Sequence, residues 1–413
     1  MNWRAIKDLL RLSPEAMRMA EVDSTKVPLS LRIKYHDVQN AISARLSKLS
    51  RKAYIDKESV MLWLEDMHKR GYHILQDIDT ESFVIAWVSP WQQLILQRQE
   101  DVCVDSTHKT CKSFLNNEDC YLFTIVAKND LTNKGCPTAF MITNSETSET
   151  VSKWLNWLKQ EVGFTPRTIM IDCNPVEINA IRTVFQESVR IFLCHWHIKH
   201  AWDKKIKKSV KASTGTKDSK ALRSEVHSDL NKLMHCGNQC DFEVLWNEFA
   251  IKWRDDKGCI EFYAYMLLRW YAKKELWCKA WRSSWSFHTN NYVESWHNQI
   301  KSFYLGRSCC RVDRVIYTLV DLVELDYRQE ALQVKFGFKS AWLSSHEKKR
   351  RKEANKVDFQ VANTMIVFEN GVVSVIKLLF MCLPFICYPV LIIYLIVTLQ
   401  IIYGSWEVVY DSL

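Results

Sequence analysis

Residues 168–193, TIMIDCNPVEINAIRTVFQESVRIFL, are the stretch that decides the fold. Residues 168–172 are a short apolar strand that ends in an acid, residues 176–185 have helical spacing, and residues 189–193 are a second apolar strand. Strands that alternate with helices are typical of a sheet covered by helices. The stretch therefore predicts an α/β domain.

The residues just upstream add three more strands. Asp101-Val102-Cys103-Val104-Asp105 again ends in an acid, and residues 121–127 and 138–142 are apolar, with turn residues between them. Residues 151–162 then have the spacing of an amphipathic helix. Three successive strands followed by helix and strand in alternation predict a mixed sheet.

The flanking regions are expected to be mainly helical. Residues 1–95 predict small helices, with Asp37 and Asp56 as N-caps, followed by a hairpin of strands over 73–77 and 82–87. Residues 198–290 predict an aromatic helical region, in which Trp277, Trp281 and Trp285 recur every four residues. We favour a packed helix face over base stacking for these tryptophans. A helix is expected to resume at Asn291 and run to Tyr304.

Composition points to a folded, intracellular protein with a basic surface. The chain has 413 residues, and 56 Lys and Arg against 47 Asp and Glu give a formal net charge of +9, which suits a polyanionic partner. Hydrophobic residues make up 47% and charged residues 25%, which excludes a collagen-like or disordered chain. The 14 cysteines show no regular pairing and no signal peptide precedes them, so reduced thiols in the cytosol or nucleus are expected.

The two strands that end in Asp105 and Asp172 indicate a ligand site. Side chains at the carboxyl ends of neighbouring strands meet at one edge of the sheet, and two adjacent carboxylates repel unless a cation lies between them. Mg²⁺ prefers oxygen ligands, and a pair of such ions supports phosphoryl transfer. Glu294, at the start of the last predicted helix, is the best third carboxylate. The 122 residues between Asp172 and Glu294 are too many for a loop and must hold a helical domain.

Four motifs in order resemble those of the Mutator-like element (MULE) transposases. Val104 to Thr110 is similar to the first-Asp motif, and Ile169 to Asp172 followed by Ala180-Ile181 is similar to the second. Leu193-Cys194-His195-Trp196-His197 resembles the Cys-x-x-His motif, and residues 289–298 resemble the Glu motif. Residues 37–40 and the helices after them also resemble the segment before that domain, so the similarity spans roughly residues 30–305.

The resemblance implies an RNase H-like fold over residues 96–305, with an α-helical insertion over about 198–290. It also implies a DDE transposase that cuts DNA and transfers 3′ ends with two divalent ions, Mg²⁺ or Mn²⁺, in the nucleus, where such enzymes commonly act as oligomers. Asp105, Asp172 and Glu294 then become the metal ligands and catalytic residues, and Cys194 and His197 form the family's Cys-x-x-His pair.

The role of that Cys-x-x-His pair is open. One cysteine and one histidine cannot complete a tetrahedral zinc site, which takes four ligands. Cys236 and Cys240 could supply the other two, but we favour a structural or DNA-positioning role for Cys194 and His197.

A run of lysines follows the same motif and could hold the DNA backbone. These residues are Lys204, Lys205, Lys207, Lys208 and Lys211. Lysine–phosphate contacts release counterions, so we expect DNA binding to weaken steeply with salt. An exposed helix face is the alternative interpretation of each single lysine.

The last hundred residues depart from the family pattern. Residues 306–370 predict a basic helical region, with a cluster over 348–352 that resembles either a nuclear-localisation signal or the cytoplasmic flank of a membrane helix. Residues 371–413 are a hydrophobic tail, in which 378–403 carry no charge and are long enough, at about 39 Å, to cross a bilayer. The zinc-binding modules that family members often carry at either end are not visible, so a truncated element is one expectation.

Three hypotheses follow for the function. The first is an active DDE transposase, the second is a catalytically silent DNA-binding protein derived from one, and the third is a tail-anchored membrane protein with a nuclease-like cytosolic domain.

Overall fold

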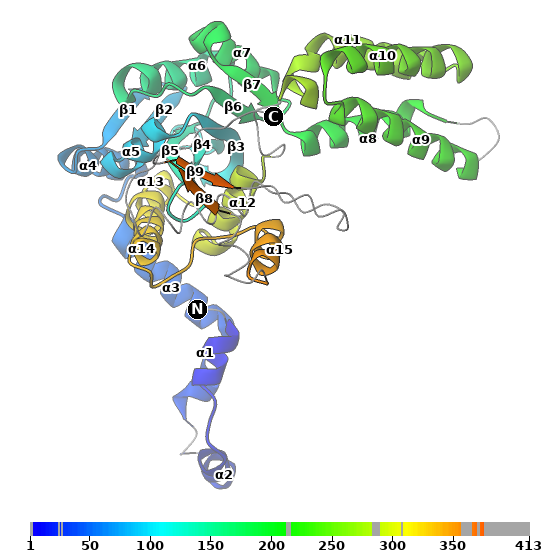
Figure 1. Cartoon of the computed structure of the whole chain (residues 1–413). Coiled ribbons are helices and arrows are strands. Elements are labelled where there is room, and N and C mark those ends of the chain that lie inside the picture. The colour runs from blue at the N-terminus through cyan, green and yellow to red at the C-terminus, as the bar shows by residue number, and fades with distance from the viewer. Residues whose placement is uncertain are drawn as a thin grey trace. The chain divides into compact units, whose positions relative to one another are not determined.

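A seven-stranded mixed sheet forms the centre of residues 1–339 (Figure 1). This computed structural model describes residues 3–23, 25, 28–211, 216–282, 290–306, 309–356, 366–369 and 372–375. The chain divides into two units, residues 1–339 and 340–413, and the sheet belongs to the first. The strands are β1 (His73–Ile78), β2 (Phe83–Val88), β3 (Asp101–Lys112), β4 (Asp119–Asn129), β5 (Lys134–Thr143), β6 (Thr168–Ile171) and β7 (Arg190–Leu193).

The strand order is β1-β2-β5-β4-β3-β6-β7, with β3, β6 and β7 parallel and the other neighbours antiparallel. The predicted mixed sheet is therefore confirmed. The expectation that the third strand ends at Asp105 is wrong, because β3 continues to Lys112. β3 pairs with β6 from Asp101 to Cys103, whereas β3 pairs with β4 through His108, and this second pairing keeps the chain extended.

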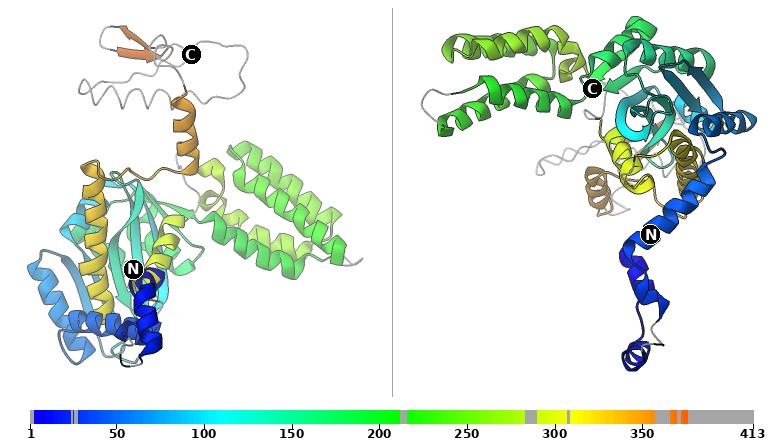
Figure 2. Two further views of the ribbon diagram at one scale, coloured as in Figure 1. Left: turned by 90° about the horizontal axis from the view of Figure 1, so that it is seen from below. Right: turned by 180° about the vertical axis from the view of Figure 1, so that it is seen from behind.

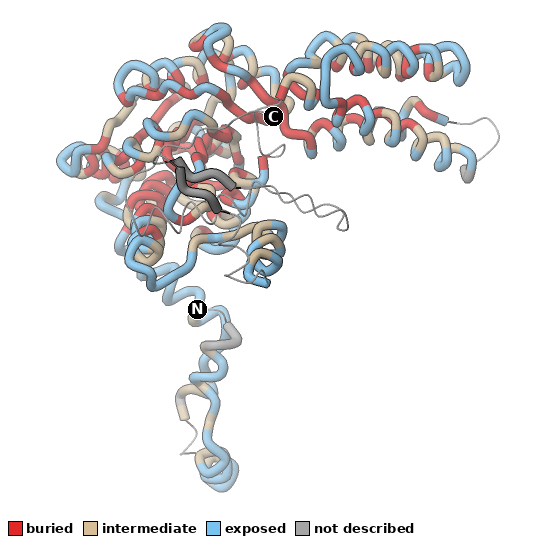
Figure 3. Tube along the Cα trace, in the orientation of Figure 1, coloured by how far each residue is buried: buried red, intermediate tan, exposed pale blue. Residues whose placement is uncertain are grey.

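Buried residues are concentrated in the strands of the sheet and in the helices packed against it (Figure 3). Alternate residues of each strand pack on opposite faces of the sheet. In β2, Val84, Ala86 and Val88 join one core, whereas Phe83, Ile85 and Trp87 join the other. The first face is covered by α5 (Pro90–Arg98), α6 (Ser148–Trp157) and α7 (Pro175–Phe185). The second is covered by α4 (Asp56–Lys69), α12 (Asn291–Gln299) and α13 (Val312–Tyr317). The last turn of α6 continues to Val162 and that of α12 to Tyr304, both as wider π-helical turns.

The N-terminal segment consists of α1 (Trp3–Leu9), α2 (Pro14–Val22), α3 (Tyr35–Ser50) and α4. Neither predicted N-cap has that role. Asp37 lies in the first turn of α3 and accepts a hydrogen bond from the Lys34 backbone, and Asp56 is the first residue of α4, where it accepts from the backbone of Val312 and Asp313. The predicted hairpin is present as β1 and β2, and β2 pairs with β5, so the hairpin extends the central sheet.

Between β7 and α12 the chain forms a helical insertion that extends away from the sheet (Figures 1 and 2). Its helices are α8 (His195–Ser209), α9 (Thr216–His235), α10 (Gln239–Ala250) and α11 (Ile260–Arg269). Residues 271–281 form short 3₁₀ turns interrupted at Lys273, so Trp277 and Trp281 do not share one regular helix. Trp277 is fully buried against Trp202, which fits core packing, and Trp285 lies outside the described residues.

The first unit ends after α14 (Glu324–Lys335), and the second contains α15 (Ser345–Ala354) and a hairpin of β8 (Ile366–Glu369) and β9 (Val372–Val375). The basic cluster 348–352 lies on α15. None of the described helices is both long and apolar enough to span a membrane. The candidate span over 378–403 lies outside the described residues.

Candidate active site

The pairing of β3 with β6 brings Asp105 and Asp172 to one place. The two strands are parallel, with Asp101 beside Thr168 and Cys103 beside Met170, an offset of 170 − 103 = 67 residues. Asp105 and Asp172 have the same separation, 172 − 105 = 67 residues, and each lies two positions beyond the last pair. The charge of Asp105 contributes to the raised pKa of Asp172, so the two carboxylates are neighbours. Cys103 and Met170 both pack in the core on the α12 side. Because side chains alternate along strands, both carboxylates project toward that side.

Glu294 reaches the same edge of the sheet from α12. Val293, Trp296 and Ile300 are buried in the core beneath this helix, and the Trp296 indole N–H donates to Thr124 Oγ1 over 3.2 Å. Glu294 lies beside this apolar stripe and is 36% exposed. The three carboxylates predicted from the sequence therefore lie around one site, contributed by β3, the end of β6 and the first turn of α12.

Two histidines lie between these carboxylates. His197 Nδ1, in the first turn of α8, is 2.7 Å from Asp172 Oδ1 and 3.6 Å from Glu294 Oε1. His297 Nδ1, one turn after Glu294, is 3.3 Å from Asp105 Oδ2. Each of the two aspartates thus has a histidine beside it that can carry a positive charge.

The charges at the site are strongly coupled. Burial lowers the pKa of His197, but the carboxylate of Asp172 and then the sulfur of Cys194 outweigh this and raise it to about 10. Burial is the main cause of the raised pKa of Asp172, although His197 acts in the opposite direction. Burial likewise raises the pKa of Glu294. The carboxylate of Asp172 therefore favours the protonated form of His197.

Two further glutamates, which the sequence analysis missed, face the same site. Glu177 of α7 is 1% exposed, and its Oε2 atom is buried without a hydrogen-bond partner among the described residues. Burial, and then the charges of Asp105 and Asp172, raise the pKa of Glu177 well above its usual value. An acid in the first turn of a helix ordinarily complements the helix dipole, so its position in the sequence gave no sign of this role.

The second of these acids, Glu146, is held in the loop between β5 and α6. Its Oε1 atom accepts hydrogen bonds from Ser106 Oγ at 3.2 Å and from Asn174 Nδ2 at 3.3 Å. Ser106 follows Asp105 in β3, and Asn174 is the N-cap of α7. Glu146 therefore connects the two segments that carry the aspartates.

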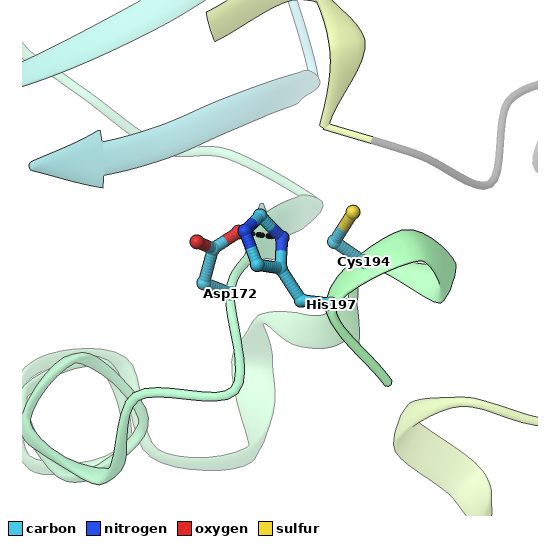
Figure 4. A group of neighbouring side chains, drawn as sticks. All are labelled: Asp172, Cys194 and His197. Atoms are coloured by element: carbon cyan, nitrogen blue, oxygen red, sulfur yellow. Dashed lines mark ion pairs between the residues drawn. The ribbon is translucent and has the colours of Figure 1, made fainter. Parts of the chain in front are cut away.

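Cys194 and His197 lie beside Asp172 (Figure 4). One ligand atom from each of these three residues lies within 4.8 Å of the other two. Within the described part of the chain, no group this tight includes Cys236 or Cys240, so the structure does not assemble the zinc site considered from the sequence. Cys236 lies instead in the helical insertion, where Cys278 Sγ contacts its carbonyl oxygen.

The three carboxylates are of the type that binds divalent cations, but in this structure their oxygen atoms are too far apart to share them. All are oxygen donors, and the Glu294 Oε1 atom is buried without a hydrogen-bond partner among described residues. However, Asp105, Asp172 and Glu294 do not form a group within 4.8 Å. The histidines beside them must shift before the carboxylates can share cations.

The predicted lysines lie along α8 and just beyond it. Ile198, Trp202 and Ile206 bury one side of this helix, and Lys204 and Lys208 are exposed on another. Two of the lysines are engaged in ion pairs, Lys205 with Glu261 at 2.5 Å and Lys207 with Asp203 at 2.6 Å. Lys211 is exposed after the end of the helix.

Comparison with known families identifies part of this chain. The family model of the MULE transposase domain matches residues 102–201, from β3 to α8. This range contains Asp105, Asp172, Cys194 and His197, whereas Glu294 lies beyond it. The match confirms the family resemblance over residues 102–201, whereas the Glu motif at 289–298 lies outside it. No curated protein matches the chain.

Proposed function

Residues 102–201 of this chain form a MULE transposase domain, which implies a transposase-related function on DNA, and on this premise we propose that the protein cuts DNA and joins strands as a DDE transposase. The observation that carries the proposal is the side-by-side placement of Asp105 and Asp172, with Glu294 reaching them from a helix more than a hundred residues away.

In this proposal, Asp105, Asp172 and Glu294 hold two divalent ions, Mg²⁺ or Mn²⁺. Such ions lower the pKa of the attacking oxygen and neutralise the charge that develops on the phosphate. His197 Nδ1 lies against Asp172 and His297 Nδ1 lies against Asp105, so both imidazole rings make room when cations bind. Glu146 connects β3 to the loop after β6 through Ser106 and Asn174.

The topology supports an RNase H-like interpretation of the fold. The antiparallel strands β5, β4 and β3 are followed by parallel β6 and β7, and a helical insertion separates β7 from the helix that carries Glu294. This is the arrangement that the family resemblance implies.

DNA binding is assigned to the exposed side of α8. The helix begins at the candidate site with His197 and carries Lys204 and Lys208 outward along one exposed side. Contacts between these lysines and phosphates position a duplex without reading its sequence.

A plasmid-nicking assay tests the proposal without knowledge of the terminal repeats. The full-length protein is incubated with supercoiled plasmid and Mg²⁺ or Mn²⁺. We expect nicking by the wild type and a loss of roughly a thousandfold or more in Asp105→Asn, Asp172→Asn and Glu294→Gln, because members of one catalytic unit are not individually dispensable. Glu118→Gln, an exposed glutamate at the start of β4, is the matched control and should retain activity.

Two other results would count against catalysis. Equal nicking by the wild type and all three variants would mean that the cleavage comes from elsewhere. Salt-sensitive DNA binding without any nicking would favour the catalytically silent DNA-binding protein.

A further inference from the structure

The contact group of Asp172, Cys194 and His197 contains donors that the proposed Mg²⁺ chemistry does not use. Cys194 occupies the N-cap position of α8 and is fully buried, and His197 follows three residues later on the same face of the helix. Asp172 lies against the imidazole ring of His197, and Cys194 lies on the opposite side (Figure 4). A carboxylate oxygen, an imidazole nitrogen and a sulfur thus converge from two elements of the fold.

Hard and soft cations select different donors. Mg²⁺ takes oxygen ligands, whereas thiolate and imidazole together favour Zn²⁺ and the related ion Co²⁺. The Asn290 backbone N–H donates to Cys194 Sγ over 3.3 Å, so the sulfur is held in a fixed position. The sulfur is therefore already placed in an environment that suits a metal ligand.

A fourth donor lies next to the group. Glu294 Oε1 is 3.6 Å from His197 Nδ1, and both atoms are buried without a hydrogen-bond partner among the residues described. The contact of His197 Nδ1 with Asp172 is close, but it does not run along the direction of the ring N–H. Ligands of a tetrahedral zinc ion lie roughly 3.3–3.8 Å apart. The spacing of Glu294 from His197 fits this range, and the 2.7 Å contact of His197 with Asp172 must widen by less than about 1 Å. Glu294 is not within 4.8 Å of all three members of the group, so its side chain must move closer to them to bind the same ion.

We propose that the protein binds one thiophilic divalent cation, of the Zn²⁺ class, through Asp172, Cys194 and His197, with Glu294 as the fourth ligand. This cation takes two of the three carboxylates assigned to the Mg²⁺ pair. It therefore competes with Mg²⁺ or Mn²⁺, a consequence that rests on the proposed function, whereas the binding itself does not.

Cobalt substitution tests the site directly. Co²⁺ is titrated into the full-length, metal-free protein, with a reductant that contains no thiol. We expect one equivalent to bind with a thiolate-to-cobalt charge-transfer band and the intense visible bands of a four-coordinate ion, and Zn²⁺ to remove both. Cys194→Ser should lose the charge-transfer band, and Cys240→Ser, which alters an exposed cysteine, should keep it.

A second pair of variants distinguishes the loss of a metal ligand from misfolding of the protein. Glu294→Gln and His197→Gln leave the sulfur in place, so the charge-transfer band should persist while the affinity for Co²⁺ falls roughly tenfold or more. The inference is overturned if the wild type shows no charge-transfer band, if Cys194→Ser retains it, or if neither glutamine variant weakens binding. The cobalt spectra need no DNA, so a protein that fails to nick plasmid can still show the charge-transfer band. A protein that nicks plasmid but lacks the charge-transfer band contradicts this inference and leaves the proposed function standing.

Discussion

Gly135 of β5 lies directly against Tyr292 of α12. A Cβ atom added at position 135 would come 2.9 Å from the Tyr292 Cβ, which is too close for two carbon atoms. Tyr292 is two residues before Glu294, so the absence of a side chain at position 135 sets how closely the helix that carries Glu294 approaches the sheet.

Gly135→Ala should therefore displace α12 and move Glu294. We expect plasmid nicking to fall at least about tenfold and the free energy of unfolding to decrease by roughly 1–3 kcal/mol, as for other overpacked sites. Gly237→Ala is the matched control, since an added Cβ there meets no atom within 4 Å. Wild-type nicking by Gly135→Ala would show that the position of α12 is not critical.

Glu177→Gln should stabilise the metal-free protein at neutral pH. The pKa of Glu177 is raised in the folded protein, chiefly by burial, so the folded state keeps a proton that the unfolded chain releases above about pH 4.5. Stability therefore falls as pH rises from that value toward the folded-state pKa, by about 1.4 kcal/mol per unit. The neutral glutamine lacks this penalty.

Thermal melts in EDTA between pH 4.5 and 8 measure this difference. The Tm of Glu177→Gln should equal that of the wild type near pH 4.5 and exceed it increasingly at higher pH. Glu118→Gln should show no such trend, because its side chain is exposed. A lower Tm for Glu177→Gln at pH 8 would mean that the carboxylate is ionised and well satisfied without metal.

Lys204 and Lys208 should contribute to DNA affinity through phosphate contacts. Replacing both by glutamine removes two contacts, so the slope of log K against log salt should become less steep by about 2. Lys48→Gln with Lys57→Gln makes the same charge change on exposed sites of α3 and α4. Fluorescence anisotropy at several salt concentrations measures these slopes. Equal slopes for the two double variants would show that α8 does not belong to the DNA-binding surface.

Asp229 should stabilise the helical insertion above pH 4. Its carboxylate accepts hydrogen bonds from Lys252 Nζ at 2.7 Å and from Trp253 Nε1 at 3.2 Å. Burial raises the pKa of Asp229, but the hydrogen bonds from Lys252 and then Lys232 outweigh this and lower it. The stabilisation is thus present above the unfolded pKa of about 3.9 and is lost as pH falls through the lower folded-state pKa.

Asp229→Asn should cost roughly 1 kcal/mol of unfolding free energy at pH 7. Urea titrations at pH 7 and at decreasing pH should show this cost shrinking with acid. Glu248→Gln, an exposed position on α10, should cost little at any pH. A cost for Asp229→Asn that stays constant with pH would assign the effect to the Trp253 hydrogen bond alone.

The strands and most helices of the first unit could be predicted from the sequence because their signals are local. Apolar runs bounded by turn residues located all seven strands of the sheet, and acids at the ends of two of those runs singled out Asp105 and Asp172. Where the prediction failed, a partner outside the element itself was responsible. β3 continues past Asp105 because β4 pairs with it, and Asp56 bonds the backbone at Val312 and Asp313 instead of capping its own helix.

The sequence by itself determined the order of the motifs, the candidate carboxylates and the separation of 67 residues that equals the register offset of β3 and β6. Only the tertiary structure decided which groups surround those carboxylates. His197 lies between Asp172 and Glu294, His297 lies beside Asp105, and Glu177 is buried behind them. The physical reason is that periodicity encodes which face of an element is buried, whereas contacts between elements far apart in the chain depend on side-chain packing, such as that of Tyr292 on Gly135.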